Sequence, residues 1–417
     1  MRSGLHALFV HQNFPGQFRH LAPALAARHG CRVVALHINP ARPLPGVETI
    51  TYVPAGGSTK GVHPWVASFE TAVIRGEATY RAAKALRSQG FSPDLIIAHP
   101  GWGEAMFLQD VWPAVPQGHY CEFYYKASGT DVNFDPEFGI EEDAASRLRV
   151  KSVHLDMHIA AMKAGISPTN WQRSTYPHHA RSRIKVIHEG IDTGLVTPRP
   201  EVGFSLRRGD VLSKLSRRDE IITFVTRNLE PQRGCHTFIR ALPEILRRRP
   251  SARVLIVGGD AVSYGRPPST PLYPPGTSWK HIFLDEVRAD LDLDRVHFLG
   301  KLPYNSYLAV LQISTVHVYL TVPFVLSWSL LEAMSAGCAI VASDTAPVRE
   351  VINGGSNGRL VDFFDPGAVA AAVCQLCESP AERASLGMAA REHVVERFDL
   401  RTHCLPAQLA WVNALTD

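Results

Sequence analysis

Short apolar runs alternate along the chain with longer segments of helical spacing. Residues 316–350 show the pattern most clearly: a run of Val and Leu, a proline-marked loop, helical spacing at Leu330, Leu331 and Met334, and a second apolar run at 339–342. Gly337 stands where a helix C-cap glycine belongs. Runs that are apolar on both faces and alternate with helices are typical of a parallel sheet covered by helices. The predicted strands are 5–10, 32–36, 47–53, 94–98, 184–187, 221–225, 253–257, 296–299, 316–320, 339–342 and 358–361.

The alternation of strand and helix begins twice, at 5–10 and again at 221–225. A chain of 417 residues is too long for one ordinary core and suits two domains of roughly 200 residues. Residues 201–219 are basic and weakly patterned, so we expect a linker or surface loop there. We therefore predict an α/β protein with Rossmann-like domains at 1–195 and 196–395, followed by a helical segment at 396–417.

Composition excludes several classes of protein. The formal charge of +4, from 43 basic and 39 acidic residues, argues against a nucleic-acid binder. Arginine clusters within 207–218 and at 247–249 are typical of solvated loops or helix ends, and weak attraction to anionic lipid is the second interpretation. No apolar run reaches the roughly 18 to 20 residues of a membrane span. We expect a cytoplasmic protein with at most peripheral contact at the inner face of the membrane.

The seven cysteines show no disulfide framework, which fits a reducing compartment. Cys374 and Cys377 have no second pair nearby, so structural thiols are expected rather than zinc ligands. Residues 131–143 are acidic but lack calcium-loop spacing. We expect no metal site, and we interpret this segment as a solvent-facing acceptor loop. The proline-rich residues 261–279 are expected to be irregular, as a lid or a partner contact.

The second half contains an expected anion site. Ser327, Trp328 and Ser329 open the helix that follows the 316–320 strand, so unpaired amides and the positive end of the helix dipole are available there. Such a helix start suits a diphosphate. Arg227 and Arg233 flank a turn after the 221–225 strand, and guanidinium binds phosphate oxygens in pairs. The alternative is two exposed surface arginines.

Three residues of the first half are candidates for a ligand site, and the first two follow predicted strands. Gly16 belongs to a Pro-Gly turn and lets a ligand approach the backbone, although a simple tight turn is the alternative. His99 ends the 94–98 run, where parallel sheets bind ligands, or is a hydrogen-bonded loop residue. Glu122 lies in an aromatic segment, where it is either a polar group that faces a ligand or a buried acid paired with Lys126 or a histidine.

Ser329-Leu-Leu-Glu332-Ala-Met-Ser-Ala-Gly337, followed by Ala342-Ser343-Asp344 and Glu350, resembles the signature of the retaining glycosyltransferases of family 4. The resemblance implies the GT-B fold, in which two Rossmann-like domains face each other across a cleft. It implies that 1–195 binds the acceptor, that 196–395 binds the nucleotide sugar, and that 396–417 crosses back to pack on the first domain.

The resemblance also implies roles for individual residues. Glu332 matches the glutamate that holds the donor ribose, with a capping box together with Ser329 as the alternative. Phe324 replaces the partner glutamate eight positions earlier, which holds the sugar, and this is a departure from the family. The backbone at Leu302 matches a contact to the nucleobase.

Other positions match the family more loosely. Arg227 and Arg233 match an Arg and a Lys that neutralise the leaving diphosphate, with one extra residue between them. Gly16 and His99 match a glycine-bearing loop and a histidine, while Glu122 replaces a second histidine close to the sugar. The resemblance thus implies that Glu122 orients the donor sugar or the acceptor hydroxyl.

The resemblance implies metal-independent glycosyl transfer with retention. The donor is a nucleotide-diphosphate sugar, UDP- or GDP-linked, and the acceptor is a hydroxyl group of a carbohydrate, lipid-linked or small-molecule substrate. The expected setting is bacterial-type glycan, glycolipid or polysaccharide synthesis, with no cofactor. Two alternatives remain: a nucleotide-sugar epimerase, which needs further acid and base carboxylates, and a catalytically silent subunit that binds nucleotides or carbohydrates.

Overall fold

The computed structural model describes residues 4–39, 43–56, 61–208, 211–269 and 271–417, with only the backbone described at 208 and 211. The chain divides into two compact units. Unit 1 comprises Met1–Asn133, Ile140–Gly190 and Leu400–Asp417, and unit 2 comprises Phe134–Gly139 and Ile191–Asp399. The chain changes units near 190 and 399, within a few residues of the expected boundaries at 195 and 395.

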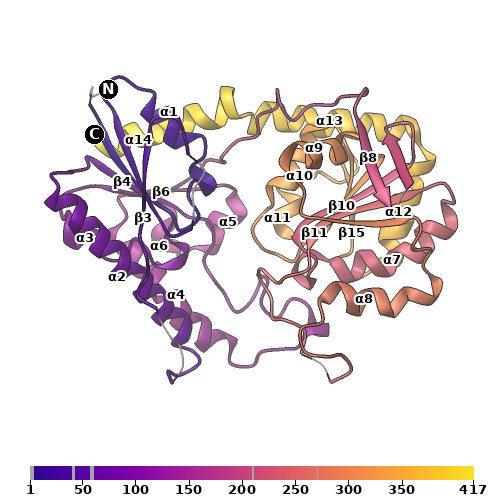
Figure 1. Cartoon of the computed structure of the whole chain (residues 1–417), viewed down its shortest axis with the longest axis horizontal. Helices are drawn as coiled ribbons and strands as arrows, with labels where there is room; N and C mark the ends of the chain where they lie inside the picture. The colour runs from indigo at the N-terminus through magenta and orange to yellow at the C-terminus, as the bar shows by residue number, and fades with distance from the viewer. Residues whose placement is uncertain (1–3, 40–42, 57–60, 209–210, 270) are drawn as a thin grey trace. The chain divides into compact units, whose positions relative to one another are not determined.

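Unit 1 is built on a sheet of seven parallel strands, in the order β3-β2-β1-β4-β5-β6-β7 among its described residues (Figure 1). The strands are β1 His6–Val10, β2 Arg32–His37, β3 Val47–Thr51, β4 Leu95–Ala98, β5 Gln117–Tyr120, β6 Ala164–Ser167 and β7 Ile184–Val186. The helices are α1 Leu21–Ala26, α2 Ala67–Ser88, α3 Leu108–Val111, α4 Ala144–Ala161, α5 Asn170–Thr175, α6 His178–Arg181 and α14 Leu405–Thr416, with short 3-10 turns η1 Gly16–Phe18 and η2 Pro100–Trp102 and a π-helical turn at Leu400–Cys404.

Alternate residues of the buried strands supply two cores, one on each face of this sheet. On β1, Ala7 and Phe9 point to the core shared with α1 and α14, whereas Leu8 and Val10 point to the core shared with α2 and α3. The two-residue period of a strand produces this division. Trp411 of α14 is 1% exposed in the first of these cores, so the last helix is an integral part of unit 1.

Unit 2 repeats the arrangement with the described strand order β12-β11-β10-β13-β14-β15, again all parallel. The strands are β10 Ile221–Asn228, β11 Arg253–Gly259, β12 Val296–Gly300, β13 Val316–Tyr319, β14 Ala339–Ser343 and β15 Arg359–Val361. The helices are α7 Cys235–Arg248, α8 Trp279–Val287, α9 Tyr304–Gln312, α10 Trp328–Ser335, α11 Ala346–Arg349, α12 Pro366–Glu378 and α13 Pro380–Phe398, with 3-10 turns η3 Pro136–Phe138, η4 Pro231–Arg233 and η5 Arg288–Asp290.

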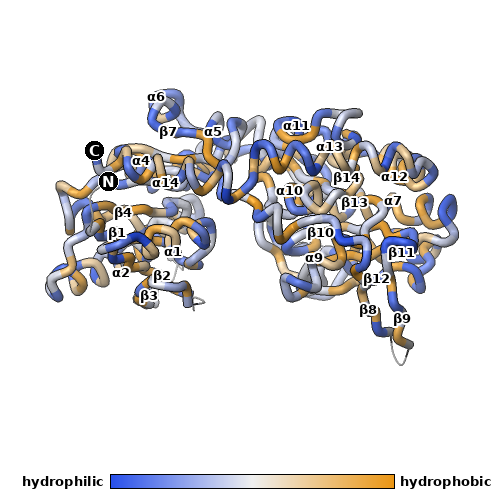
Figure 2. The backbone as a smooth tube through the Cα atoms, turned by 90° about the horizontal axis from the view of Figure 1, so that it is seen from above, coloured by the Kyte–Doolittle hydropathy of each residue, from blue (hydrophilic) through white to orange (hydrophobic). Residues whose placement is uncertain are grey.

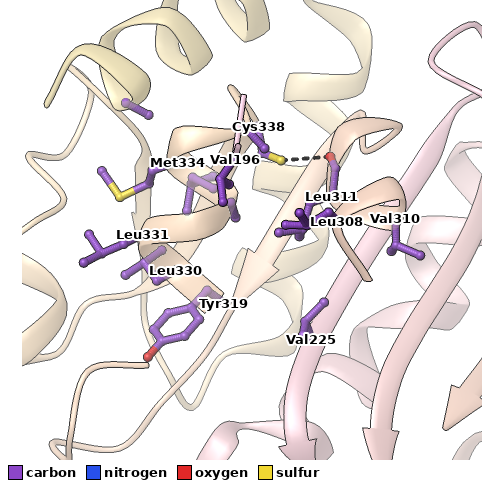
Figure 3. Packing of buried hydrophobic residues seen from close by; sticks show 14 of the residues in the cluster. Val196, Val225, Leu308, Val310, Leu311, Tyr319, Leu330, Leu331, Met334 and Cys338 are labelled. Atoms are coloured by element: carbon purple, nitrogen blue, oxygen red, sulfur yellow. Dashed lines mark hydrogen bonds between the residues drawn. The ribbon is translucent and has the colours of Figure 1, made fainter. Parts of the chain in front are cut away.

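Helix α10 is held firmly in the core of unit 2. Figure 3 shows Leu330, Leu331 and Met334 of α10 in one cluster with Leu308 and Leu311 of α9. The helix ends before a glycine, residue 337, whose φ of 75° is the left-handed conformation expected after a helix. Close packing on one side therefore fixes where the amino-terminal end of α10 lies.

Two sequence interpretations are wrong. The segment expected to be a loop instead contains two antiparallel strands, β8 Gly203–Arg208 and β9 Val211–Ser216, because Leu206 and Leu215 pack against the core of unit 2. Figure 2 shows these two strands reaching out from the rest of unit 2. The acidic segment is not a solvent-facing loop throughout, since Phe134–Gly139 belongs to unit 2, where Phe138 contacts the rings of α8. Helices α9 and α11 were not expected from the sequence.

The predicted fold class is confirmed: both units are parallel α/β sheets of Rossmann type. In each sheet the strand order reverses beside the first strand, between β1 and β4 and between β10 and β13. Ligands of such sheets bind at the carboxyl ends of the strands at this reversal. No helix within the described residues is long and apolar enough to cross a membrane.

Candidate active site

Three side chains meet at the carboxyl edge of the unit 1 sheet. His11 follows β1, His99 follows β4, and Glu122 comes shortly after β5. The rings of His11 and His99 lie 5.1 Å apart, and His99 Nε2 lies 3.4 Å from Glu122 Oε2. The structure thus brings together His99 and Glu122, both expected from the sequence, and adds His11.

Gln17 connects this cluster to the glycine turn. Its Nε2 donates to Glu122 Oε1 over 2.7 Å, and its Oε1 lies 2.8 Å from His11 Nε2. His11 Nδ1 accepts from the amide of Asn13, so the ring proton is on Nε2 and is donated to Gln17. Burial, followed by the charge of His99, lowers the pKa of His11 to about 3, which keeps it neutral. Gly16 has a φ of 46°, and a Cβ there would collide with the His11 ring.

Glu122 is ionised in this setting. Burial raises its pKa, but the hydrogen bond and charge of His99, together with Gln17 and His11, outweigh burial and bring the pKa below its usual range. The alternative of a pair with a histidine is therefore partly correct, whereas Lys126 donates to the carbonyl of Ser174 instead. The side chain remains 25% exposed, so it is accessible to a ligand.

A small open pocket of about 40 Å³ lies over Glu122. Its lining is mainly aromatic and includes Trp102, Tyr120, Phe123, Tyr125 and Tyr176. A carboxylate surrounded by ring faces suits a polyhydroxy ligand, whose hydroxyls donate to the acid while its C–H groups pack on the rings.

Arg227 and Arg233 lie at the carboxyl end of β10 in unit 2. Arg227 is exposed, whereas Arg233 is 6% exposed and donates from Nη1 to Thr321 Oγ1 over 2.8 Å and to the carbonyl of Val325 over 3.1 Å. Neither arginine forms an ion pair with a carboxylate among the described residues. Burial lowers the pKa of Arg233, but Tyr319, Tyr264 and Glu230 raise it by more than burial lowers it. The net pKa is therefore raised, and the guanidinium stays charged.

The start of α10 supplies the adjacent amides. The Ser327 amide donates to the Tyr319 hydroxyl over 3.0 Å, and Ser327 Oγ accepts from the Ser329 amide over a long 3.4 Å. Ser327 is therefore the N-cap, and an anion at this end would share or replace these internal contacts. Trp328 is the first residue of the helix.

Glu332 does not form the capping box that the sequence allowed. Its Oε1 accepts from the Tyr304 hydroxyl over 2.7 Å and its Oε2 from the Tyr307 hydroxyl over 2.6 Å. Each carboxylate oxygen has a second lone pair, so a ribose contact is chemically compatible with both tyrosines. Leu302, just before α9, packs partly buried against the core of unit 2, and its contact to a base stays a prediction.

Phe324 packs against the Tyr264 ring at 5.0 Å and lies 5.7 Å from Arg233 Cζ. It is 6% exposed. Where the family resemblance implies an acid, this chain has a ring on the wall beside its buried arginine.

One group of histidine and carboxylates is close enough to hold a metal among the described residues: Asp135, Glu137 and His236. Both oxygens of Glu137 already accept from Arg240, which also binds Glu286. Arg240 thus occupies both oxygens of Glu137, Asp135 pairs with His236, and the arrangement is explained by the packing of Phe134–Gly139 on α7 and α8.

Sequence reasoning missed several residues of both clusters. His11 directly follows a buried strand, so the rule that identified His99 would have found it. Gln17, Tyr264, Tyr304 and Tyr307 carry no motif, and only the tertiary structure shows their contacts.

Two family models match the chain. Residues 29–196 match the model for the glycosyl transferase family 4 group, and residues 212–393 match the model for glycosyl transferases group 1. The first match lies in the half that contains His99 and Glu122, and the second in the half that contains Arg227 and Arg233.

Several curated relatives are named as glycosyltransferases. D-inositol 3-phosphate glycosyltransferase of Corynebacterium urealyticum is 27% identical over 74% of this chain and 68% of its own length. Phosphatidyl-myo-inositol mannosyltransferase of Mycolicibacterium smegmatis is 30% identical over 45% of this chain and 44% of its own length. The second match thus spans less than half of that relative.

Solved structures share the fold. Sucrose-phosphate synthase of Thermosynechococcus elongatus has a TM-score of 0.70 at 20% identity, covering 99% of both chains. HepE of Anabaena, solved in complex with UDP and glucose, has a TM-score of 0.64 at 17% identity, covering 98% of this chain and 99% of its own. With the family matches and the curated relatives, these likenesses identify the chain as a glycosyltransferase of the GT-B fold, with a family 4 group domain followed by a group 1 domain.

Proposed function

We propose that this glycosyltransferase moves a sugar from a nucleotide-diphosphate sugar to an acceptor hydroxyl, with retention at the anomeric carbon and without a metal. In this proposal unit 2 binds the donor and unit 1 binds the acceptor. The observation that carries it is the pair of guanidiniums, Arg227 and Arg233, which lack a carboxylate partner among the described residues. Arg233 donates to the carbonyl of Val325, two residues before the N-cap of α10, and both arginines contact the Tyr264 ring.

The charge of this site suits a diphosphate. Arg233 is buried and stays ionised, so its attraction for an anion is weakly screened by water. Arg227 is exposed and adds a second cation at the same strand end. As the bond between sugar and diphosphate breaks, negative charge grows on the leaving oxygen, and these fixed groups stabilise it without rearranging.

The relatives support the nature of the donor. HepE was solved with UDP and with UDP-glucose, and one curated relative is named as a GDP-mannose-dependent mannosyltransferase. We therefore propose a UDP- or GDP-linked sugar. Glu332, held by Tyr304 and Tyr307, is positioned as the acceptor for ribose hydroxyls, and the backbone at Leu302 is the proposed contact to the base.

Glu122 is the proposed contact to the acceptor hydroxyl. It is ionised, partly exposed and oriented by Gln17 and His99. As the resemblance to family 4 implies, the hydroxyl attacks from the face that the diphosphate leaves, and a diphosphate oxygen takes its proton. The chain then needs no nucleophile of its own.

The acceptor class follows from the relatives and from the pocket. Several curated relatives are named for inositol phosphate or phosphatidylinositol compounds, and the aromatic lining of the pocket over Glu122 suits the C–H face of a polyol or sugar. We propose a hydroxyl of a carbohydrate, a lipid-linked glycan or a small polyol, used at the cytoplasmic face of the membrane in glycan, glycolipid or polysaccharide synthesis.

The test combines binding with turnover. Binding of UDP and GDP is measured by calorimetry, and nucleotide release is measured with a panel of donors, for wild type, Arg227→Ala and Arg233→Ala. Loss of a charge-assisted contact to phosphate should weaken binding by about 10- to 100-fold. Arg247→Ala is the control, because Arg247 is 72% exposed on α7 and pairs only with Glu244 in the described part of the chain.

The outcomes separate the alternatives. If both site variants lose less than about tenfold, roughly 1.4 kcal/mol, the electrostatic role is wrong. Nucleotide binding without turnover on any donor and acceptor would indicate a silent binding subunit. Turnover that survives a chelator is expected, whereas its loss and restoration by a divalent ion would contradict the metal-independent mechanism.

A further inference from the structure

The ring of Tyr264 lies against both guanidiniums of the anion site. Its centroid is 5.9 Å from Arg227 Cζ and 5.1 Å from Arg233 Cζ. The same ring lies 5.0 Å from the ring of Phe324. Two rings and two cations therefore form one group, which we call the Tyr264 cluster.

The backbone at Tyr264 is fixed by a buried carboxylate. Glu230 is fully buried, and its Oε2 accepts from the amides of Ser263, Tyr264 and Gly265 over 3.0 to 3.3 Å. Asn228 Nδ2 donates to Ser263 Oγ over 2.6 Å. The first residues of the proline-rich segment are thus anchored to the end of β10, which places Tyr264 at the mouth of the site.

Stacked rings and a bound anion use different parts of a guanidinium. Aromatic rings contact its face, whereas oxygen atoms accept hydrogen bonds in its plane. The Tyr264 hydroxyl also acts on Arg233 as a side-chain hydrogen-bond partner. A guanidinium has five N–H donors, so Arg233 can contact Tyr264 and still donate to a diphosphate. Phe324 is 6% exposed and supports the wall, while Tyr264 is 37% exposed and offers ring surface to a ligand.

We propose that Tyr264 is a donor-binding residue whose ring packs on the C–H face of the transferred sugar while Arg227 and Arg233 bind the diphosphate. This inference rests on the proposed function and names how the donor sugar is recognised. The sugar is bonded directly to the diphosphate, so it lies next to whatever wall adjoins the two arginines. That wall is formed by Tyr264 and Phe324, and an aromatic wall selects a pyranose by its apolar face.

The test compares a nucleotide with its own sugar conjugate. Dissociation constants of UDP and UDP-glucose, and of GDP and GDP-mannose, are measured for wild type, Tyr264→Ala and Tyr264→Phe, using the pair that wild type binds. We expect Tyr264→Ala to weaken the conjugate about 3- to 10-fold more than the free diphosphate, the usual effect of one ring contact. Tyr264→Phe keeps the ring and should stay within about twofold of wild type.

Tyr273→Ala is the matched control, because Tyr273 lies in the same proline-rich segment outside the Tyr264 cluster. An equal loss for conjugate and free diphosphate in Tyr264→Ala would show that the ring only supports the arginines, and would overturn the proposal.

Saturation-transfer NMR on the wild type covers the case in which a variant fails to fold. Irradiation of aromatic protons should saturate the sugar protons of the conjugate, and absence of transfer to them would also overturn the proposal. If the wild type binds neither the free diphosphates nor their sugar conjugates, the proposed function itself is wrong. That result differs from an equal loss of conjugate and diphosphate binding in Tyr264→Ala, which contradicts only the role of Tyr264.

Discussion

Replacing Glu230 with Gln tests how the anion site is held together. The substitution keeps the size of the side chain but removes its charge. Glu230 Oε2 accepts from three consecutive amides, at Ser263, Tyr264 and Gly265, and the carboxylate also lies close enough to favour the charged form of Arg233. The glutamine oxygen can take the place of Oε2, yet each hydrogen bond then has a neutral acceptor.

The magnitude follows from that count of bonds. Hydrogen bonds to a charged group contribute about 0.5 to 1.5 kcal/mol more than neutral ones, so three bonds lose about 2 to 4 kcal/mol. The amides of 263–265 should then exchange with solvent about 30- to 1,000-fold faster, if this segment opens independently of the rest of unit 2.

Hydrogen exchange followed by mass spectrometry or NMR measures this change. Glu244→Gln on α7 is the control, because Glu244 is 42% exposed and pairs with exposed Arg247, where loss of a pair costs only about 0.2 to 1 kcal/mol. Unchanged exchange at 263–265 in Glu230→Gln would refute the anchoring role, and with it the fixed position of Tyr264. A variant that also loses its preference for the sugar conjugate would link the anchor to donor binding.

Three further predictions concern unit 1. Glu122→Gln should lower the free energy of unfolding at neutral pH, because the pKa of Glu122 is depressed in the folded state. The wild type has this stabilisation above the ordinary carboxyl pKa and loses it as pH falls through the folded pKa. Urea unfolding curves of variant and wild type should therefore converge at acid pH, and curves that diverge there would contradict the prediction. Gly16→Ala should lower the unfolding temperature more than Gly129→Ala, since both glycines have positive φ but only the first Cβ collides, with His11; equal shifts would exclude the clash. Trp411→Ala should cost about 3 to 5 kcal/mol in the unfolding free energy of unit 1, and a loss below about 1 kcal/mol would show that α14 is not part of its core.

Much of the unit 1 cluster was predictable, because the topology of the sheet determines which strand ends lie next to one another. His99 and Glu122 follow β4 and β5, which pair with each other, and Gly16 follows β1, which pairs with β4. Neighbouring parallel strands end at one edge, so side chains far apart in sequence meet there. The strands before Gly16 and His99 were predicted, so the convergence of these two residues followed. The strand before Glu122, β5, was not predicted from the pattern, and the place of Glu122 rested on the family resemblance.

Strand β8 had a sequence pattern typical of a strand, but the basic composition of the segment was given more weight. Phe204 and Leu206 alternate with Ser205 and Arg207, which is the period of a half-buried strand. The basic character of the segment favoured a solvated loop instead. Residues 134–139 were misjudged for the same reason, because their acidic residues concealed two aromatic anchors, Phe134 and Phe138.

The contacts of Glu332 and Tyr264 lay beyond sequence reasoning. Tyr304 and Tyr307 lie 28 and 25 positions before Glu332, and no periodic pattern links a loop or a helix start to a distant acid. Tyr264 belongs to a segment without regular structure, anchored by a buried carboxylate that reads in sequence as one more polar residue near a turn. Such partners are set by packing and are not encoded in local spacing.

The contrast between two arginines of unit 2 supports the proposed anion site. Arg240 donates to Glu137 and Glu286, so its charge is neutralised within the fold. Arg233 is more deeply buried, yet its contacts are neutral: Thr321 Oγ1, the carbonyl of Val325 and two ring faces.

Burial alone would disfavour this cation, but Tyr319, Tyr264 and Glu230 together favour its charged form by more than burial disfavours it. Glu230, the carboxylate that acts on Arg233, is itself engaged by three amides. A bound anion would therefore complete the electrostatics of this site, and because Arg233 has already lost most of its water, little of that attraction is spent on desolvation.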